Sequence, residues 1–468
     1  MPAWRLAHIP VVVAPLAAAL LLLTLAAPVA AVTHPGSDPT DITPVGGLVF
    51  FAASTAAHGR ELWVTDGTQA GTHEVADINP AAGIGSSPRQ LVAMGGKVYF
   101  MADDGSGAKL WKSDGTATGT KPLGAGGLGL LNVNGRLFYM SYPKLWTSDG
   151  TIGGTHSIAK IDGIDDWGTF AGLDGFYYFF ADDWGDSGSL PQLWKSNGTS
   201  AGTSMVAEIA ATGPDGQTFT VPSDLVAAGS HVFFRMGEAV ACAIARSTLA
   251  DWGCIGEGRL WQSDGTTVGT RQVAVDGDVY PDLVDFDGKL YFGVDDYSAG
   301  LLALFRTDGN DAGTHMVKNN MLPGTSTVVG SRLFIFAWSA PGDALWRTKG
   351  TTRTTREVYP IALPECRLFS NDTYCGLDET PAAAGGKLFF PAASVGNGTE
   401  LWTSDGTPVG THQVKNIVYG GASSNPSSLT AAGSLLYFAA RDVNHGRELW
   451  VSDGTSRGTH MVMDINPG

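Results

Sequence analysis

The strongest constraint on this chain is one sequence unit that recurs along almost its whole length. Residues 61–80 read ELWVTDGTQAGTHEVADINP, and residues 448–467 read ELWVSDGTSRGTHMVMDINP. The same frame returns between these two copies, with an aromatic anchor before each Asp-Gly-Thr-like turn. A unit repeated in tandem at this spacing is typical of solenoids and propellers, in which each unit buries an apolar face against the next. The anchors are Trp63, Trp111, Trp146, Trp194, Trp261, Phe305, Trp346, Trp402 and Trp450.

Each copy carries four strand signals separated by turn signals. In the second copy we predict strands at 90–93, 97–101, 109–112 and 120–123, because β-branched and aromatic residues are enriched there. Gly95-Gly96 predicts a tight hairpin between the first two strands. In the turn SDGT at 113–116, the aspartate can accept backbone N–H bonds and the glycine can take positive φ. We therefore interpret the repeated aspartate as structural, and the aromatic anchor as the group that fastens each sheet to its neighbour.

A four-stranded unit of this length in tandem predicts an all-β fold, a β-propeller of nine blades. The blades are expected to start near residues 38, 87, 125, 164, 220, 279, 322, 380 and 425. Eight blades is the alternative, since one degraded copy between 176 and 386 could be an insertion. An open solenoid would need polar capping repeats, whereas the outer copies here are the best preserved. A closed ring needs no caps, because closure leaves no exposed inner edge.

The N-terminus predicts export. Arg5 precedes an apolar run at 11–27, and the small residues at 29–31 provide a cleavage site after Ala31, which is typical of a secretory signal peptide. An uncleaved membrane anchor is the alternative, although Pro15 interrupts a run near the lower length limit for a spanning helix. We expect a signal peptide at 1–31, a linker at 32–37 and one propeller at 38–468, with no membrane span after signal removal. The mature protein is expected to be secreted, at the cell surface or in the periplasm.

Charge and cysteine content narrow the partners and the compartment. The chain has 29 Lys and Arg against 45 Asp and Glu, a formal net charge of −16, and an acidic protein repels phosphate backbones. Nucleic acid is therefore not an expected partner. The cysteines form two neighbourhoods, Cys242 with Cys254 and Cys366 with Cys375. In an oxidising compartment they predict two local disulfides, with four unrelated buried thiols as the alternative.

The repeated Glu-Leu-Trp-x-x-Asp-Gly-Thr, followed by Gly-Thr, resembles the ELWxxDGT repeat of secreted and surface proteins of bacteria. The resemblance covers residues 38 to 468, and its motif is most complete in copies one, two, three, eight and nine. It implies an exported, repeat-built, propeller-like protein. It implies little about activity, because it carries no catalytic residue across to this chain.

Acidic pairs are expected in the connections between the second and third strands of several blades, at 103–104, 182–183 and 295–296. Asp182, Asp183 and Asp186 are candidate ligands for calcium, because Asp-rich glycine loops can supply several oxygen atoms. Their spacing does not match an EF-hand loop, and solvated turn acids are the alternative interpretation. No other cofactor is expected.

Four tryptophans of the mature chain are not repeat anchors, and they lie within or near the longer connections. An indole can stack on the apolar face of a sugar, and loops on a rigid scaffold often carry function. These residues are therefore candidate ligand contacts, with packing of each indole onto its own loop as the alternative. The four are Trp167, Trp184, Trp252 and Trp338.

Five histidines share one repeat position, directly after the second Gly-Thr, and three further copies have lysine or arginine there. A ring of such groups could receive an anion or respond to pH. An exposed strand face inherited by duplication is the alternative. The positions are His73, His156, His315, His412 and His460, with Lys121, Arg271 and Arg356.

Together these features predict a secreted, non-catalytic propeller that acts as an extracellular binding scaffold for a protein or carbohydrate ligand, as a monomer. A propeller enzyme acting on glycans, a lyase or a hydrolase, is the rival class, and a purely structural envelope protein is the third. An enzyme of this fold would gather unique acids, histidines or tyrosines at its central pocket. The candidates for such a group are Asp165, Asp166, Asp282, Asp285 and Tyr297.

Overall fold

Antiparallel sheets make up nearly all the regular structure of this chain. The computed structural model describes residues 35–81, 83–161, 163, 169–181, 190–212, 218–219, 221–237, 258–296, 300–339, 342–361, 366–369, 372–375, 379–394 and 396–467. The helical elements in these ranges are two single 3-10 turns, η1 (Asp311–Gly313) and η2 (Thr352–Thr354). Within the same ranges, no helix has the length and apolar character needed to cross a membrane.

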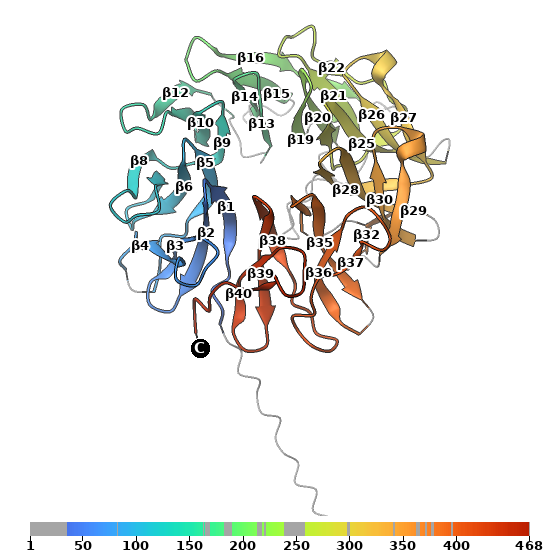
Figure 1. Ribbon diagram of the computed structural model, residues 1–468. Coiled ribbons are helices and arrows are strands. Elements are labelled where there is room, and N and C mark those ends of the chain that lie inside the picture. The colour runs from blue at the N-terminus through green and yellow to red at the C-terminus, as the bar shows by residue number, and fades with distance from the viewer. Residues whose placement is uncertain are drawn as a thin grey trace, which may run out of the picture. The chain divides into compact units, whose positions relative to one another are not determined.

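Nine sheets, here called blades one to nine in chain order, stand around one axis (Figure 1). Each is an antiparallel meander whose first strand is innermost. The innermost strands are β1 (Thr40–Val45), β5 (Arg89–Met94), β9 (Leu128–Val133), β13 (Phe170–Leu173), β19 (Val221–Ala228), β23 (Asp278–Val279) with β24 (Val284–Phe286), β28 (Leu322–Val329), β34 (Ala382–Ala384) and β38 (Ser427–Ala432).

The other three strands of each blade follow in order toward the outside. The second strands are β2 (Leu48–Thr55), β6 (Lys97–Asp103), β10 (Arg136–Ser141), β14 (Phe176–Ala181), β20 (His231–Gly237), β25 (Lys289–Asp296), β29 (Arg332–Ser339), β35 (Lys387–Ser394) and β39 (Leu435–Asp442). The third strands are β3 (Gly59–Thr65), β7 (Ala108–Ser113), β11 (Lys144–Ser148), β15 (Gln192–Ser196), β21 (Gly258–Ser263), β26 (Leu301–Thr307), β30 (Gly342–Thr348), β36 (Gly398–Ser404) and β40 (Gly446–Ser452).

The outermost strands begin directly after the repeated turn. They are β4 (His73–Ala76), β8 (Lys121–Ala125), β12 (His156–Lys160), β16 (Thr203–Glu208), β22 (Arg271–Gln272), β27 (His315–Asn319), β31 (Arg356–Pro360), β37 (His412–Gln413) and β41 (His460–Met461). Two small hairpins lie in links between blades, β17 (Ala211–Thr212) with β18 (Thr218–Phe219), and β32 (Cys366–Phe369) with β33 (Asp372–Cys375).

The ring is closed. Every innermost strand contacts those of its two neighbours, and β38 of blade nine contacts β1 of blade one. The prediction of a nine-bladed propeller is confirmed, and the eight-bladed alternative is wrong, because each degraded copy forms a complete blade. The four strands predicted in the second copy correspond to β5, β6, β7 and β8.

The aromatic anchors hold adjacent blades together, as the sequence predicts. Trp111 of blade two packs in a buried cluster with Phe50 and Val64 of blade one. Trp63 of blade one packs in the same way with Tyr437 and Leu449 of blade nine. The seam that closes the ring therefore uses the same apolar contact as the internal seams, and burying one such side chain contributes about 1.5–3 kcal/mol.

The turn between the third and fourth strands explains the spacing of its aspartate and its second glycine. In blade one, the Asp66 carboxylate accepts the N–H of Thr68 at 2.9 Å and its hydroxyl at 2.7 Å. The same carboxylate lies against Gly71, where a Cβ would stand 2.1 Å from Asp66 Oδ1. These hydrogen bonds lower the pKa of Asp66. The second glycine is therefore required by the aspartate before it.

Blade seven supports this explanation, because it has lost both residues together. Lys349 stands in place of the aspartate and Thr354 in place of the glycine. The Thr354 hydroxyl now accepts the N–H of Thr351 at 3.2 Å and that of Lys349 at 3.3 Å. In blade seven, the hydroxyl of Thr354 at the glycine position therefore takes the place of the carboxylate at the aspartate position.

Links between blades fold around a buried glutamate. Glu61 is fully buried and accepts the N–H groups of Asn79 at 3.2 Å and Ser86 at 2.8 Å, together with the Ser86 hydroxyl. Glu400 of blade eight is bound in the same way by the link at 417–424. Burial raises the pKa of both carboxyls, because the charged form loses its hydration.

The innermost strands are also tied to one another by side chains. Asp41 Oδ1 accepts the N–H of Gln90 at 2.7 Å, and Gln90 Oε1 accepts the N–H of Leu130 at 3.1 Å. Glu379 Oε2 accepts the N–H of Ser428 at 3.0 Å. Asp41, Gln90 and Ser428 all have φ between 53° and 54°. These left-handed residues sit at bulges in the first strand, which turn their N–H groups toward the preceding blade.

The dependence between the two turn positions can be tested in blade eight. Gly410→Thr is expected to lower the free energy of unfolding by about 1–3 kcal/mol, because a Cβ there would lie 2.1 Å from Asp405 Oδ1. The double variant Asp405→Lys with Gly410→Thr copies blade seven and is expected to recover most of that loss. Urea unfolding followed by tryptophan fluorescence measures both. Equal losses in the single and double variants would contradict the explanation.

Candidate functional site

The two faces of the ring are built from different connections. Because each blade is a meander, the turns between strands one and two and between strands three and four lie on one face, here called the turn face. The connections between strands two and three, and the links between blades, lie on the other, the loop face. Turn-face connections keep the same length throughout. The connections between strands two and three range from 142–143 in blade three to 238–257 in blade five, and the links between blades range from 126–127 to 361–381. Variation is therefore confined to the loop face.

Exposed aromatic side chains lie on the loop face. Tyr142, between β10 and β11, is 78% exposed, and Tyr419, between blades eight and nine, is 86% exposed. Trp338, at the loop-face end of β29, is 37% exposed. The large apolar side chains exposed in the turns of the opposite face are aliphatic, namely Ile152, Val268 and Val409. Among the described residues, aromatic exposure is therefore one-sided.

Trp338 is the one sequence-predicted ligand contact that the structure describes. Its indole is 37% exposed on the loop face, but it lies within β29 beside the two-residue connection 340–341 and not near a longer connection as predicted. The connections that contain Trp184 and Trp252 leave from the loop-face ends of β14 and β20. Trp167, Trp184 and Trp252 themselves lie outside the described residues. Their role in ligand binding stays a prediction.

The described acids of the loop face form structural contacts. Asp103 Oδ1 accepts the N–H groups of Gly105 at 2.8 Å and Gly107 at 2.9 Å, and Asp295 is buried and accepts the Tyr280 hydroxyl at 3.3 Å. Where the chain is described, no cluster of three or more His, Cys, Asp or Glu is placed to hold a metal. The predicted calcium ligands Asp182, Asp183 and Asp186 lie outside the described residues.

One of the two predicted disulfides has its backbone described. Cys366 on β32 is directly opposite Cys375 on β33 in an antiparallel pair, in the link between blades seven and eight. Cys242 and Cys254 lie outside the described residues. Both disulfides stay predictions, and both connections belong to the loop face.

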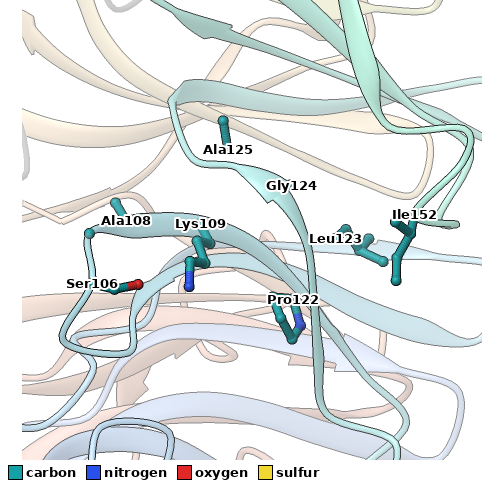
Figure 2. A pocket seen from close by; sticks show the side chains of 9 residues that line it. Ser106, Ala108, Lys109, Pro122, Leu123, Gly124, Ala125 and Ile152 are labelled. Carbon is teal, nitrogen blue, oxygen red and sulfur yellow. The ribbon is translucent and has the colours of Figure 1, made fainter.

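A pocket of about 420 Å³ opens between blades two and three. Figure 2 shows its lining, which comes from the start of β7, from β8 and from the turn of blade three. Apolar groups form most of the wall, whereas Lys109 and Ser106 stand at one end. The lining residues are Ser106, Gly107, Ala108, Lys109, Pro122, Leu123, Gly124, Ala125 and Ile152.

Three features of the seam between blades two and three accompany the pocket. The link from β8 to β9 is residues 126–127, too short to cover the outer part of the seam. Gly124 has no side chain there, and a Cβ would stand 2.8 Å from Thr155 Cγ2. Ile152 in the turn of blade three is equivalent to Ser200 in the turn of blade four. In the seam between blades three and four, the Ser200 hydroxyl donates to the Ile158 carbonyl at 2.7 Å. Blade three therefore presents an apolar side chain where blade four has a hydrogen bond.

An ion pair closes the polar end of the pocket. Lys109 Nζ lies 2.6 Å from Asp104 Oδ2, and the Ser106 hydroxyl donates to Asp104 Oδ1 at 2.7 Å. The hydrogen bond from Lys109, with that from Ser106, lowers the pKa of Asp104 to about 2. Because the ammonium is already paired with Asp104, the pocket offers mainly apolar surface.

Blades five and six meet through a charged joint that the sequence does not reveal. Arg259 stands where blades one, eight and nine have glutamate, and it forms an ion pair with Asp278 and donates to the Gly277 carbonyl at 2.8 Å. Arg235, fully buried, donates to the Val279 carbonyl at 2.6 Å. In the Glu61 joint the third strand supplies the hydrogen-bond acceptor and the link supplies the donors. Here Arg259 on the third strand supplies the donor, and Gly277 and Asp278 of the next blade supply the acceptors. These residues hold blades together, as the glutamates do elsewhere.

Two members of the acid group predicted for an enzyme are described. Asp285 lies within β24, opposite Leu290 of β25, and Asp282 precedes that strand at φ 79°. The other members lie outside the described residues, so their convergence at a central pocket stays a prediction. These are Asp165, Asp166 and Tyr297.

The histidines and cations of the repeat position open the outermost strands. All five histidines are exposed, and they stand at the outer rim of the ring (Figure 1). They are therefore spread around the circumference rather than gathered at one site. His315 Nε2 also accepts a hydrogen bond from Arg306 Nε at 2.9 Å within its own blade.

Comparisons with known proteins find solved structures of low similarity and no related family. No family model matches the chain, and no curated protein matches it. Among solved structures, it is similar to a puromycin hydrolase at 12% identity and TM-score 0.37, covering 75% of this chain and 58% of that one. The β-propeller domain of the Trilobed protease from Pyrococcus furiosus matches at 13% identity and TM-score 0.35, over 69% of this chain and 97% of that one. An oligogalacturonate lyase in complex with manganese matches at 12% and TM-score 0.39, over 63% and 82%.

The chain thus spans less than two thirds of the puromycin hydrolase. At identities of 12–13% and TM-scores of 0.35–0.39, these similarities say nothing about what this chain binds or catalyses. The candidate site is therefore argued from its own residues, which are the exposed aromatic side chains and variable connections of the loop face and the apolar pocket between blades two and three.

The explanation of the pocket can be tested at Ile152. Ile152→Ser places a hydroxyl where Ser200 has one in blade four, so it is expected to donate to the Leu123 carbonyl. We expect this variant to be more stable than Ile152→Ala by about 0.5–1.5 kcal/mol, the net contribution of one hydrogen bond. Thermal unfolding measures the difference. If the serine and alanine variants unfold alike, the hydroxyl does not reach the neighbouring strand.

Proposed function

We propose that this chain is a secreted, non-catalytic β-propeller that binds a carbohydrate ligand through its loop face. The observation that carries the proposal is the one-sided exposure of aromatic side chains, with Tyr142, Trp338 and Tyr419 all on that face. The resemblance of the repeat to exported ELWxxDGT proteins and the N-terminal signal peptide predicted at 1–31 support an extracellular location.

The chemistry of the exposed side chains supports a sugar as the ligand. Tyrosine and tryptophan combine an apolar ring, which can stack on a pyranose face, with a polar atom that can bind a hydroxyl. The support from exposure lies in its one-sidedness, because the three exposed rings share the face that carries the variable connections. Val268 and Val409 on the turn face offer no comparable ring, and the turns around them are alike in nearly every blade.

The architecture supports binding by several separate contacts. The three aromatic residues belong to blades three and seven and to the link into blade nine, so they are spread around the ring. The inter-blade hydrogen bonds and anchors hold these blades rigidly, and ligand-binding loops on a rigid scaffold lose little entropy on binding. An extended polysaccharide that crosses the face would meet more than one ring, and each added contact raises the overall affinity.

The proposal is tested by screening the purified protein on a glycan array and then measuring the best ligand by calorimetry. Tyr142→Ala and Tyr419→Ala are each expected to weaken binding by about tenfold, the effect of losing roughly 1.4 kcal/mol of stacking. Because both side chains are exposed, neither substitution should change the thermal unfolding midpoint.

Val268→Ala and Val409→Ala are the matched controls. Both positions are 93% exposed on the turn face, and their substitution is expected to leave the affinity unchanged. Equal weakening in the controls and in the tyrosine variants would reject the loop face as the binding surface. An array without any glycan signal would reject the carbohydrate as ligand.

A further inference from the structure

Residues 35–38 lie on blade nine and lead directly into β1 of blade one. Their contacts with blade nine are non-covalent. The Ser37 side chain is fully buried and donates its hydroxyl to Glu448 Oε2 of blade nine at 2.6 Å. The N–H groups of Ser37 and Asp38 both donate to the Arg447 carbonyl, at 2.9 and 3.1 Å. This segment, here called the latch, then continues into β1 of blade one.

The latch repeats two contacts of the joint between blades one and two. Gly36 lies so close to the backbone of Arg447 that a Cβ would stand 2.3 Å from its nitrogen, and Gly85 lies in the same way against Arg60, at 2.2 Å. Asn466 Nδ2 donates to the Gly36 carbonyl at 2.8 Å, just as Asn79 Nδ2 donates to the Gly85 carbonyl at 3.1 Å. In the internal joints the chain is continuous between these two residues. At the latch it is not, so non-covalent contacts alone hold the segment in place.

The carboxyl that receives the latch is less well bound than its counterparts. Glu61 and Glu400 accept backbone N–H groups on Oε1, whereas Glu448 Oε1 is buried and has no donor among the described residues. The Ile465 N–H donates to the other oxygen at 3.3 Å. Burial raises the pKa of Glu448 to about 7, although the Ser37 hydroxyl and the backbone N–H groups of Ser37 and Ile465 lower it.

Neighbouring titratable groups act on Glu448 in opposite directions, because Asp464 adds a like charge whereas a protonated His445 attracts the carboxylate. Asp464, whose buried Oδ1 also has no donor among the described residues, adds a like charge that raises the pKa of Glu448. His445 is engaged by Asp442 at 2.8 Å, which raises the pKa of that imidazole. The Arg447 side chain points to the start of blade nine, where it donates to the Asn425 carbonyl at 2.9 Å and lies 3.9 Å from Asp38. Among the described residues, no ion pair is formed to the Glu448 carboxylate.

We propose that residues 35–38 are a releasable latch of the ring, and that protonation of Glu448 keeps the latch closed. A protonated carboxyl needs no second donor on Oε1, accepts the Ser37 hydroxyl and leaves no buried charge. An ionised carboxyl has a buried oxygen without a hydrogen-bond donor among the described residues, which costs free energy. Ionisation therefore favours release of the latch from blade nine, while the apolar cluster around Trp63 still holds blades nine and one together.

The direction of the pH dependence follows from the raised pKa. Glu448 keeps its proton in the closed ring up to about pH 7, whereas the ordinary value for a free glutamate is 4.5. Its contribution to closure is therefore full below about pH 4.5 and is lost as the pH rises through 7. Between these values, opening releases one proton, so the opening equilibrium constant rises about tenfold per pH unit.

Hydrogen exchange measured by mass spectrometry tests the proposal on the intact chain. The amides of Ser37 and Asp38, and that of Ser54, which donates to the Ser37 carbonyl at 2.8 Å, report on the latch. After correction for intrinsic exchange, their protection is expected to fall about tenfold per unit from pH 5 to 7 and to level off above pH 7. Protection that is constant over this range would overturn the proposal without any variant.

Two substitutions separate the latch from general stability. Glu448→Gln keeps an oxygen that can accept the Ser37 hydroxyl, and it replaces the unpaired oxygen Oε1 with an amide nitrogen, which needs no donor. The glutamine cannot ionise, so the protection of the latch is expected to become independent of pH. Glu400→Gln is the matched control in an internal joint and should leave the pH profile of the latch unchanged. If Glu448→Gln shows the same pH profile as the parent protein, another group releases the latch and the proposal fails.

Discussion

A pair of hydroxyl groups fixes the same turn in all nine blades, and the other features of the blade depend on it. The Ser or Thr that ends the third strand hydrogen-bonds to the Thr that precedes the fourth, at 2.6–2.8 Å in every blade. The N–H of the turn glycine donates to the same hydroxyl, as Gly67 does to Thr65 at 2.9 Å. This arrangement sets the direction in which the third strand enters the turn, and with it the side on which the aromatic anchor packs. Blade seven keeps the pair, Thr348 with Thr355, although its aspartate and second glycine are gone.

The repeat allowed the fold to be predicted because its informative residues are local. Anchor, turn and hairpin glycines lie within one unit, so their spacing alone indicates four strands and the seam between blades. The bonds around the axis of the ring have no such signal. Asp41, Gln90 and Glu379 are three different residue types, and each uses a side-chain oxygen to accept a backbone N–H of the next blade. Because the residue type changes from blade to blade, the sequence shows no repeat at this position. The charged joint of blade five is similar, since the loss of a glutamate is visible at Arg259 but its partner Asp278 becomes apparent only in three dimensions.

The candidate site could be predicted in part. The sequence indicated that longer connections carry function, and Trp338 does lie exposed on the face that contains them. It gave no weight to Tyr142 and Tyr419, because these residues stand outside the repeat and resemble ordinary loop residues until their exposure is known. The pocket beside Ile152 was also not predictable, since it arises from a short link, a glycine and an apolar residue contributed by two different blades. The face on which each connection lies follows from the meander order of the strands. Every long connection can therefore be placed on the loop face without knowing any side-chain position.

The match between the closing seam and the internal joints has a consequence for how such a ring can be encoded. Asn466 and Gly36 stand in the same relation as Asn79 and Gly85, which the chain connects through residues 80–84. A connector of that length between Pro467 and Gly36 would therefore make the ring continuous there, and a break within 80–84 would provide new termini at an equivalent place. The linear order of the blades is thus one of several circular permutations that specify the same ring, and gene duplication can extend or reopen such a ring at a joint without rebuilding a sheet.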